Sequence, residues 1–154
     1  MKKITSFCVD HTKLMEGMYI SRIDKDCVTY DMRTCRPNMG MLMDNSTIHT
    51  TEHMIATFIR NSEIADDVIY FGPMGCQTGF YLIVRDSVAK EKVLEVVKDC
   101  LKKTLEYEGE VFGNSPIECG NYINLDLAKA KRLCGVYLSI LENTNMILNY
   151  EDVN

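Results

Sequence analysis

The sequence predicts an α+β fold built from two layers. Short apolar runs typical of strands are mixed with long amphipathic stretches typical of helices, without the regular alternation of βαβ units. No linker, internal repeat or low-complexity segment divides the chain of 154 residues. We therefore expect one domain over residues 1–154, a length at which folding buries roughly two-thirds of the unfolded surface.

The first third of the chain is expected to supply two strands and a helix. Residues 4–9 and 27–33 have β-type composition, with apolar and polar residues in partial alternation. The helix that follows is expected to begin at a cap supplied by Ser46 or Thr47 and to continue to about Asn61.

The rest of the chain predicts a strand pair and two longer helices. Apolar runs at 68–71 and 80–84 indicate strands, joined by a glycine-rich turn over 72–79. A helix capped by Ser87 is expected to continue to about residue 107, and a last helix spans about 125–141.

Composition and charge restrict the possible partners and compartment. The formal net charge is −5, with dispersed lysines and arginines, which argues against nucleic acid as a partner. No run approaches the roughly 20 apolar residues of a membrane span, and no apolar segment of a secretory signal follows the two N-terminal lysines. Seven cysteines, an odd number without a C-x-x-C pair, do not indicate a disulfide framework. We therefore expect a cytoplasmic protein, with Cys100 and Cys134 in the core of its amphipathic helices.

The most informative run is His49-Thr50-Thr51-Glu52-His53, which concentrates metal-site chemistry in one turn of the predicted helix. The spacing of four residues puts both imidazoles on one face, about 6 Å apart along the axis, which suits two ligands of one divalent cation. Glu52 shares that face and could transfer protons beside a metal. The order H-x-x-E-H is the inverse of the commoner H-E-x-x-H zinc motif. The alternative is a pair of surface histidines on a helix.

A catalytic metal held by two histidines needs a third protein ligand, from a cysteine or a carboxylate. Cys119 is the best candidate, because it lies in a loop before a helix and Gly120 lets the backbone bend around an ion. A buried structural cysteine is the alternative at this position. A thiolate ligand would favour Zn or Fe(II) over Mg or Ca.

Three further residues could belong to a site. Cys76 lies in the glycine-rich turn, where it is either a functional thiol presented to a cleft or a half-buried turn cysteine. Arg33 could bind an anionic or hydroxyl-rich substrate, or form a salt bridge at an exposed strand end. His11 could be oriented by the neighbouring carboxylate of Asp10.

Taken together, these segments resemble the S-ribosylhomocysteine lyase (LuxS) family, the enzymes that make the autoinducer-2 precursor. The matching stretches follow the family's order, with similar spacing, along nearly the whole chain. They are Ser6-Phe7 with Asp10-His11, Asp31-Met32-Arg33 with Pro37-Asn38, and residues 47–53, 73–81, 118–120 and 130–133.

The resemblance implies that His49, His53 and Cys119 bind one divalent metal per subunit, natively Fe(II) and often replaced by Zn or Co. It also implies that Cys76 and Glu52 are the acid/base pair. The reaction would cleave the thioether of S-ribosylhomocysteine to homocysteine and 4,5-dihydroxy-2,3-pentanedione. Two carbonyl migrations and a β-elimination accomplish this without a redox cofactor.

The resemblance further implies that Ser6, His11 and Arg33 contact the sugar end of the substrate. The family's site lies between two subunits of a homodimer, and its fold is a sandwich with an antiparallel sheet covered by helices. One departure is Leu125, which stands where the family leads us to expect a histidine. Any outer-shell role of that histidine is therefore expected to be absent.

Two other interpretations remain open at this point. An inverzincin-type metallopeptidase would use Glu52 to activate a metal-bound water, with Glu118 or Glu142 as the more natural third ligand. A non-catalytic metal-binding protein would instead close a shell of four ligands around the ion.

Overall fold

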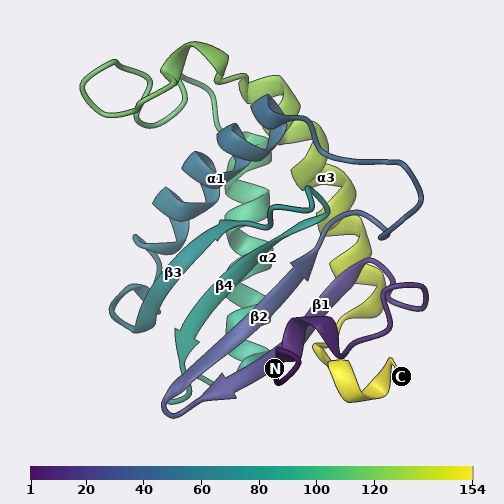
Figure 1. The fold of residues 1–154 in the computed structure, drawn as a ribbon. Coiled ribbons are helices and arrows are strands. Elements are labelled where there is room, and N and C mark those ends of the chain that lie inside the picture. The colour runs from purple at the N-terminus through teal and green to yellow at the C-terminus, as the bar shows by residue number, and fades with distance from the viewer. Residues whose placement is uncertain (154) are drawn as a thin grey trace.

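The computed structural model describes residues 1–153 and confirms the predicted α+β class, with one mostly antiparallel sheet packed against three helices (Figure 1). The strands are β1 (Gly17–Asp24), β2 (Cys27–Arg33), β3 (Val68–Pro73), β4 (Gly79–Arg85) and β5 (Leu148–Asn149). The helices are α1 (Asn45–Ile59), α2 (Lys90–Glu106) and α3 (Leu127–Thr144). The strand order is β3-β4-β2-β1-β5, and only the short β5 runs parallel to its neighbour.

The predicted strands at 27–33, 68–71 and 80–84 are confirmed, whereas the strand expected over 4–9 is wrong. Thr5–Phe7 form a 3-10 turn instead. The sheet offers this segment no partner on that side, because β1 pairs with β2 along one edge and with β5 along the other.

The two faces of β2 have different surroundings, because side chains alternate along a strand. Val28, Tyr30 and Met32 belong to the main hydrophobic core that the helices share. Asp31 and Arg33 lie on the opposite face and are nevertheless buried, with 0% and 1% of their surfaces exposed. Buried charges need hydrogen-bond or ionic partners, so the segments that cover this face of the sheet must supply partners to Asp31 and Arg33.

Helix α1 begins at a different cap from the one predicted. The Asp44 carboxylate accepts a hydrogen bond from the backbone N–H of Thr47 at 2.7 Å, which makes Asp44 the N-cap. The hydroxyl of Ser46 instead donates to the backbone carbonyl of Asn124, 2.6 Å away. The start of α1 is therefore tied to the segment that precedes α3.

Helices α2 and α3 begin later than predicted, whereas α1 begins slightly earlier. The Ser87 hydroxyl donates to Asp67 at 3.1 Å, and the N-cap position of α2 is Ala89, which provides no side-chain hydrogen bond. At α3, the Asp126 carboxylate accepts from the backbone N–H of Lys129 at 3.3 Å. This cap fixes the start of α3 just after the loop that contains Cys119.

Each of these helices buries one face against its neighbours. Cys100 on α2 and Cys134 on α3 are fully buried, as predicted, and burial raises the pKa of each thiol to about 12. Neither thiol is therefore a candidate for the chemistry. Within residues 1–153, none of the helices has the length and apolar character needed to cross a membrane.

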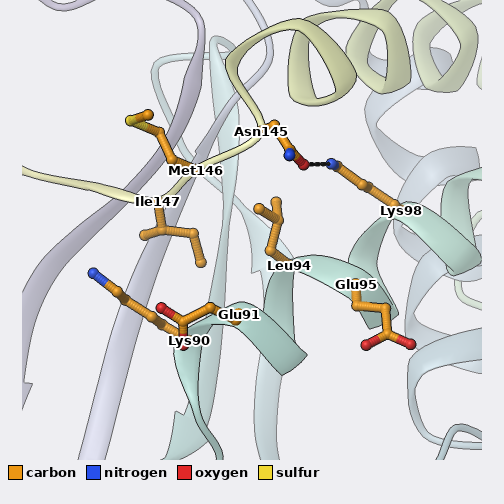
Figure 2. A pocket seen from close by; sticks show the side chains of 8 residues that line it. All are labelled: Lys90, Glu91, Leu94, Glu95, Lys98, Asn145, Met146 and Ile147. Carbon is orange, nitrogen blue, oxygen red and sulfur yellow. Dashed lines mark hydrogen bonds between the residues drawn. The ribbon is translucent and has the colours of Figure 1, made fainter.

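Helix α3 ends at Thr144, and the left-handed backbone of the next residue, Asn145 (φ 48°), stops the helix. Lys98 of α2 donates to the Asn145 side chain at 2.6 Å, beside a cavity of about 410 Å³ (Figure 2). Two lysines, two glutamates and no histidine or cysteine line this cavity, so it carries none of the candidate chemistry. Its lining residues are Lys90, Glu91, Leu94, Glu95, Lys98, Asn145, Met146 and Ile147.

Candidate metal centre and active site

Three side chains that can ligate a metal converge where α1 meets the loop before α3. His49 and His53 lie one turn apart on α1, with ring centroids 4.6 Å apart in an edge-to-face arrangement. The Cys119 sulfur lies 3.2 Å from Nε2 of His49, and ligand atoms of all three residues lie within 4.8 Å of one another. Nitrogen and sulfur ligands of one tetrahedral ion stand roughly 3.5 Å apart, so this cluster is consistent with one metal site.

Hydrogen bonds determine which ring nitrogens face the cluster. Nδ1 of His49 lies 2.6 Å from the side-chain oxygen of Asn124, and Nδ1 of His53 lies 2.7 Å from the Phe112 carbonyl oxygen. The amide nitrogen of Asn124 donates to Asn45, which assigns its oxygen to His49. Both Nδ1 atoms therefore carry a proton and donate it, which leaves both Nε2 lone pairs available to a metal.

The carbonyl of Phe112 reaches His53 because the next residue is Gly113. Its φ of +71° lies in the left-handed region, and a Cβ at this position would stand 3.1 Å from Nδ1 of His53. A side chain here would press on the imidazole that the carbonyl orients. Gly113 thus allows the loop to approach α1 closely.

Asn124 was not identified from the sequence, although Leu125 beside it was noted as a departure. Leu125 packs against the small hydrophobic cluster that contains Met54, Val111 and Ala130. The side chain of Leu125 cannot fill the role of a histidine, as expected, whereas Asn124 beside it provides a hydrogen-bond acceptor to Nδ1 of His49. The available signal in the sequence was the side-chain amide of Asn124, next to the position where a histidine was expected.

Replacing Asn124 with leucine is expected to weaken metal binding about 10- to 100-fold, because His49 loses the acceptor that fixes its tautomer and ring orientation. Competition with a chromogenic chelator measures this affinity without reference to activity. Asn61→Leu is the matched control, since its exposed amide donates to the Thr57 carbonyl at the other end of α1. Equal affinities for wild type and Asn124→Leu would contradict this role of Asn124.

Glu52 lies beside the metal-ligand cluster on the same helix. It is partly exposed and borders, together with His53, a shallow hollow of about 270 Å³. A carboxylate in this position can exchange protons with a molecule held in the hollow. The remaining lining residues are Ala56, Thr57, Phe112 and Gly113.

Cys76 belongs to a second group, at the turn between β3 and β4. The residue is exposed, and its partly buried sulfur lies 3.0 Å from the hydroxyl of Thr78 and 3.8 Å from Nη1 of Arg33. Nη1 of Arg33 also donates to the Thr78 hydroxyl at 2.6 Å. Because that oxygen already accepts from Arg33, its own proton is available to donate to the Cys76 sulfur.

This environment favours the thiolate of Cys76. Partial burial opposes the charged form, but hydrogen bonds from Thr78 and the charge of Arg33 outweigh burial and lower the pKa of the Cys76 thiol. Sequence patterns alone did not reveal the contribution of Thr78.

Arg33 is not the exposed strand-end residue considered above. Its side chain is buried and forms an ion pair with Asp31 at 2.5 Å. Burial disfavours the charged guanidinium, but Asp31 outweighs burial and raises the pKa of Arg33, so the charge is retained. A fixed positive charge therefore lies beside the Cys76 turn.

Ser6 and His11 lie in the N-terminal segment. Ser6 is in the 3-10 turn Thr5–Phe7, and Nδ1 of His11 is 3.1 Å from the Val9 carbonyl oxygen. Val9 belongs to a small cluster with Tyr150, whose hydroxyl reaches Asp31. Burial raises the pKa of Asp31, and the charges of Arg33 and, to a smaller extent, His11 partly offset this rise.

The N-terminal residues and the metal-ligand cluster occupy different parts of the fold. In Figure 1 the N-terminal turn (purple) and the loop that carries Cys119 (green) lie at opposite ends of the molecule. The structure thus groups His49, His53 and Cys119, and it groups Arg33 with Cys76. Within residues 1–153 of one chain, Ser6 does not reach the metal-ligand cluster.

Known proteins with similar sequences match over nearly the whole length. A profile of the family S-Ribosylhomocysteinase (LuxS) matches residues 4–147. The S-ribosylhomocysteine lyase of Finegoldia magna is 42% identical over 147 residues, covering 93% of this chain and 94% of the relative. That of Clostridium beijerinckii is 40% identical over 159 residues, covering 100% and 97%. That of Desulfotalea psychrophila is 42% identical over 149 residues, covering 93% and 94%. The chain therefore belongs to the LuxS family of S-ribosylhomocysteinases.

Proposed function

We propose that this chain is an S-ribosylhomocysteine lyase that produces homocysteine and 4,5-dihydroxy-2,3-pentanedione. Its metal ligands are His49, His53 and Cys119, and its acid/base pair is Cys76 and Glu52. The convergence of the three ligands, with both imidazole Nε2 atoms available, carries this assignment in a chain of the LuxS family.

The donor set fits a borderline-soft divalent ion. Two imidazole nitrogens and a thiolate suit Fe(II), Zn or Co, and we expect Fe(II) to be the native metal. The backbone N–H of Asn121 donates to the Cys119 sulfur at 3.4 Å, a contact that helps to fix the position of the sulfur. When bound, the metal would supply a Lewis acid for the oxygens of the opened sugar.

Cys76 is suited to move the carbon-bound protons. Each carbonyl migration requires a base that removes a proton from one carbon and returns it to the neighbouring carbon. The Cys76 thiolate can take that proton, and the nearby Arg33 charge favours its release afterwards, because it stabilises the thiolate. In the last step the C4 proton is lost, a C4–C5 double bond forms, and the C5–S bond breaks to release homocysteine thiolate. The electrons balance without an oxidant.

Glu52 completes the proton transfers on the oxygen side. Its carboxylate borders the hollow beside His53, where it can carry protons between a hydroxyl and a carbonyl oxygen of the substrate. This role needs a titrating carboxylate but no metal–carboxylate bond.

The Glu52→Gln substitution is therefore expected to preserve the metal content. It should reduce turnover about 10²- to 10⁴-fold, which is the usual contribution of a general acid/base. Metal analysis beside thiol release from S-ribosylhomocysteine measures both quantities. Glu63→Gln, which affects an exposed carboxylate paired with Lys92, serves as the control. Normal turnover in Glu52→Gln would remove Glu52 from this role.

Release of thiol from S-ribosylhomocysteine by anaerobically purified protein tests the proposed function itself. Release establishes the lyase. Its absence from folded, metal-loaded protein would overturn the proposal, and cleavage of an unstructured peptide would then favour a metallopeptidase.

We further propose that the active unit is a homodimer with the substrate between two subunits. Ser6, His11 and Arg33 would hold the sugar end on one subunit, beside Cys76. The partner subunit would provide the metal and Glu52. The separation of the N-terminal turn from the metal-ligand cluster within one chain supports this arrangement.

Mixing two inactive variants is expected to restore activity if the site is shared. Random pairing of His53→Ala and Cys76→Ala chains makes half of the dimers mixed, and one of the two sites in each mixed dimer is intact, so about one quarter of wild-type activity returns. Co-refolding followed by thiol release measures the recovery. A mixture of His53→Ala and Cys119→Ala should recover nothing, because both defects fall in the same half-site. Failure of the first mixture, with mixed dimers demonstrated, would contradict the shared site.

A further inference from the structure

The C-terminal tail covers the sheet face that carries Asp31 and Arg33. Strand β5 pairs with β1, and the chain then turns through a 3-10 helix, Tyr150–Asp152. A capping box between Asn149 and Asp152 fixes this turn. In Figure 1 the yellow C-terminal turn lies beside β1, near the N-terminal segment.

Tyr150 is the residue of this tail that reaches the buried ion pair. Only 6% of its surface is exposed, and its ring lies 6.2 Å from that of Tyr19. Its hydroxyl donates to Oδ2 of Asp31 at 2.5 Å. The same oxygen accepts a hydrogen bond from Nη2 of Arg33, also at 2.5 Å.

The ion pair uses one of the two hydrogen bonds that its groups could make. A carboxylate and a guanidinium commonly pair through two parallel bonds. Here Oδ1 of Asp31 and Nε of Arg33 have no hydrogen-bond partner among residues 1–153. The Tyr150 hydroxyl holds Oδ2, and with it the carboxylate, in the orientation that makes the single bond.

Nη1 of Arg33 takes no part in the ion pair and points the other way. This nitrogen donates to the Thr78 hydroxyl at 2.6 Å and lies 3.8 Å from the Cys76 sulfur. Hydrogen bonds therefore connect Tyr150 to Thr78 through Asp31 and Arg33, and Thr78 contacts Cys76.

We propose that Tyr150 is a positioning residue for Cys76: by holding the Asp31 carboxylate, it keeps Arg33 directed at Thr78 and the Cys76 sulfur. The catalytic significance of this arrangement rests on the proposed function, whereas its effect on the thiol does not. Without the hydroxyl, Asp31 turns to bind both Nε and Nη2 of Arg33, and Nη1 withdraws from the thiol.

The charged and titratable groups around the Cys76 thiol determine how its reactivity depends on pH. Arg33 on β2 is the charged group that faces Cys76, with Asp31 behind it. The other titratable side chains that act electrostatically on Asp31 or Arg33 include Tyr81 on β4, Tyr19 on β1, Tyr137 on α3, Cys35, and His11 of the N-terminal segment. Withdrawal of Arg33 removes a positive charge near the sulfur, so the thiol deprotonates at a higher pH.

Alkylation of Cys76 in metal-loaded Tyr150→Phe protein tests the proposal. Iodoacetamide labelling is followed across pH, and the Cys76 peptide is quantified by mass spectrometry. Since the thiolate is the reactive form, we expect the profile to move to higher pH and the rate at neutral pH to fall about threefold or more. Tyr19→Phe is the matched control, because its buried hydroxyl in the same cluster donates to the Met15 carbonyl. Its profile should match wild type.

An unchanged profile in folded Tyr150→Phe, or an equal shift in Tyr19→Phe, would overturn the proposal. If Tyr150→Phe fails to fold, Asn149→Ala provides the second variant, because it breaks the capping box and keeps the tyrosine. We expect a smaller shift in the same direction, and no shift would again overturn the proposal. Labelling needs no lyase activity, so a wild-type protein that released no thiol would refute the proposed function alone.

Discussion

The Cys76→Ala substitution is expected to abolish thiol release from S-ribosylhomocysteine, while the metal content and the fold remain those of wild type. Cys76 contacts Arg33 and Thr78, and no contact within residues 1–153 joins it to the metal-ligand cluster. The substitution therefore removes the proposed proton carrier and leaves the three candidate metal ligands in place. Loss of such a group typically costs about 10² to 10⁴ in rate. Thiol release, metal analysis and thermal unfolding measure the three properties.

The control for this variant is Cys27→Ala. Cys27 is another partly exposed cysteine, at the end of β2 remote from Arg33, and its thiol contacts Asp26. Its replacement should leave turnover intact. Normal turnover in Cys76→Ala would refute the proposed mechanism. A metallopeptidase would instead be indifferent to Cys76→Ala and would lose peptide cleavage in Glu52→Gln.

Strands with a continuous pattern could be predicted from the sequence, and β1 could not. Strand β2 and the β3–β4 pair consist of apolar or alternating runs bounded by turn residues, so local composition locates them. In β1 the pairing register with β2 shifts between Ile20 and Arg22, which interrupts the alternation. The segment at 4–9 has similar composition, but the tail occupies the adjacent edge as β5. Long-range competition for that edge is invisible in a local window.

The candidate metal ligands could be singled out from the sequence because their spacing suits metal chemistry. His49 and His53 need only a helix to share a face, and the family resemblance pointed to Cys119. The groups that orient them come from distant parts of the chain, as with Asn124, 75 residues after His49. A hydrogen bond between residues so far apart in the sequence forms only once the loop has folded, so no sequence periodicity predicts it.

Replacing Cys119 with alanine is expected to remove the metal as well as the activity. Among residues 1–153, the cluster that could hold the ion consists of His49, His53 and Cys119, so Cys119 provides its one thiol. The Cys119 sulfur lies 3.2 Å from Nε2 of His49. Its loss leaves two imidazoles, which are too few for a catalytic site with three protein ligands. The fall in affinity should therefore exceed the roughly 10- to 100-fold expected when a ligand loses only a hydrogen-bond partner, as His49 does in Asn124→Leu. Metal analysis after dialysis against a chelator measures it.

Glu118→Gln is the decisive comparison, because Glu118 is the adjacent carboxylate that a metallopeptidase interpretation would use as third ligand. In the structure its carboxylate accepts from the Ser115 hydroxyl at 2.6 Å, within the loop itself. We therefore expect Glu118→Gln to keep both metal and lyase activity. The opposite pattern, with metal retained in Cys119→Ala and lost in Glu118→Gln, would move the third ligand to the carboxylate. It would also deprive the site of the soft thiolate donor on which the preference for Fe(II), Zn or Co rests.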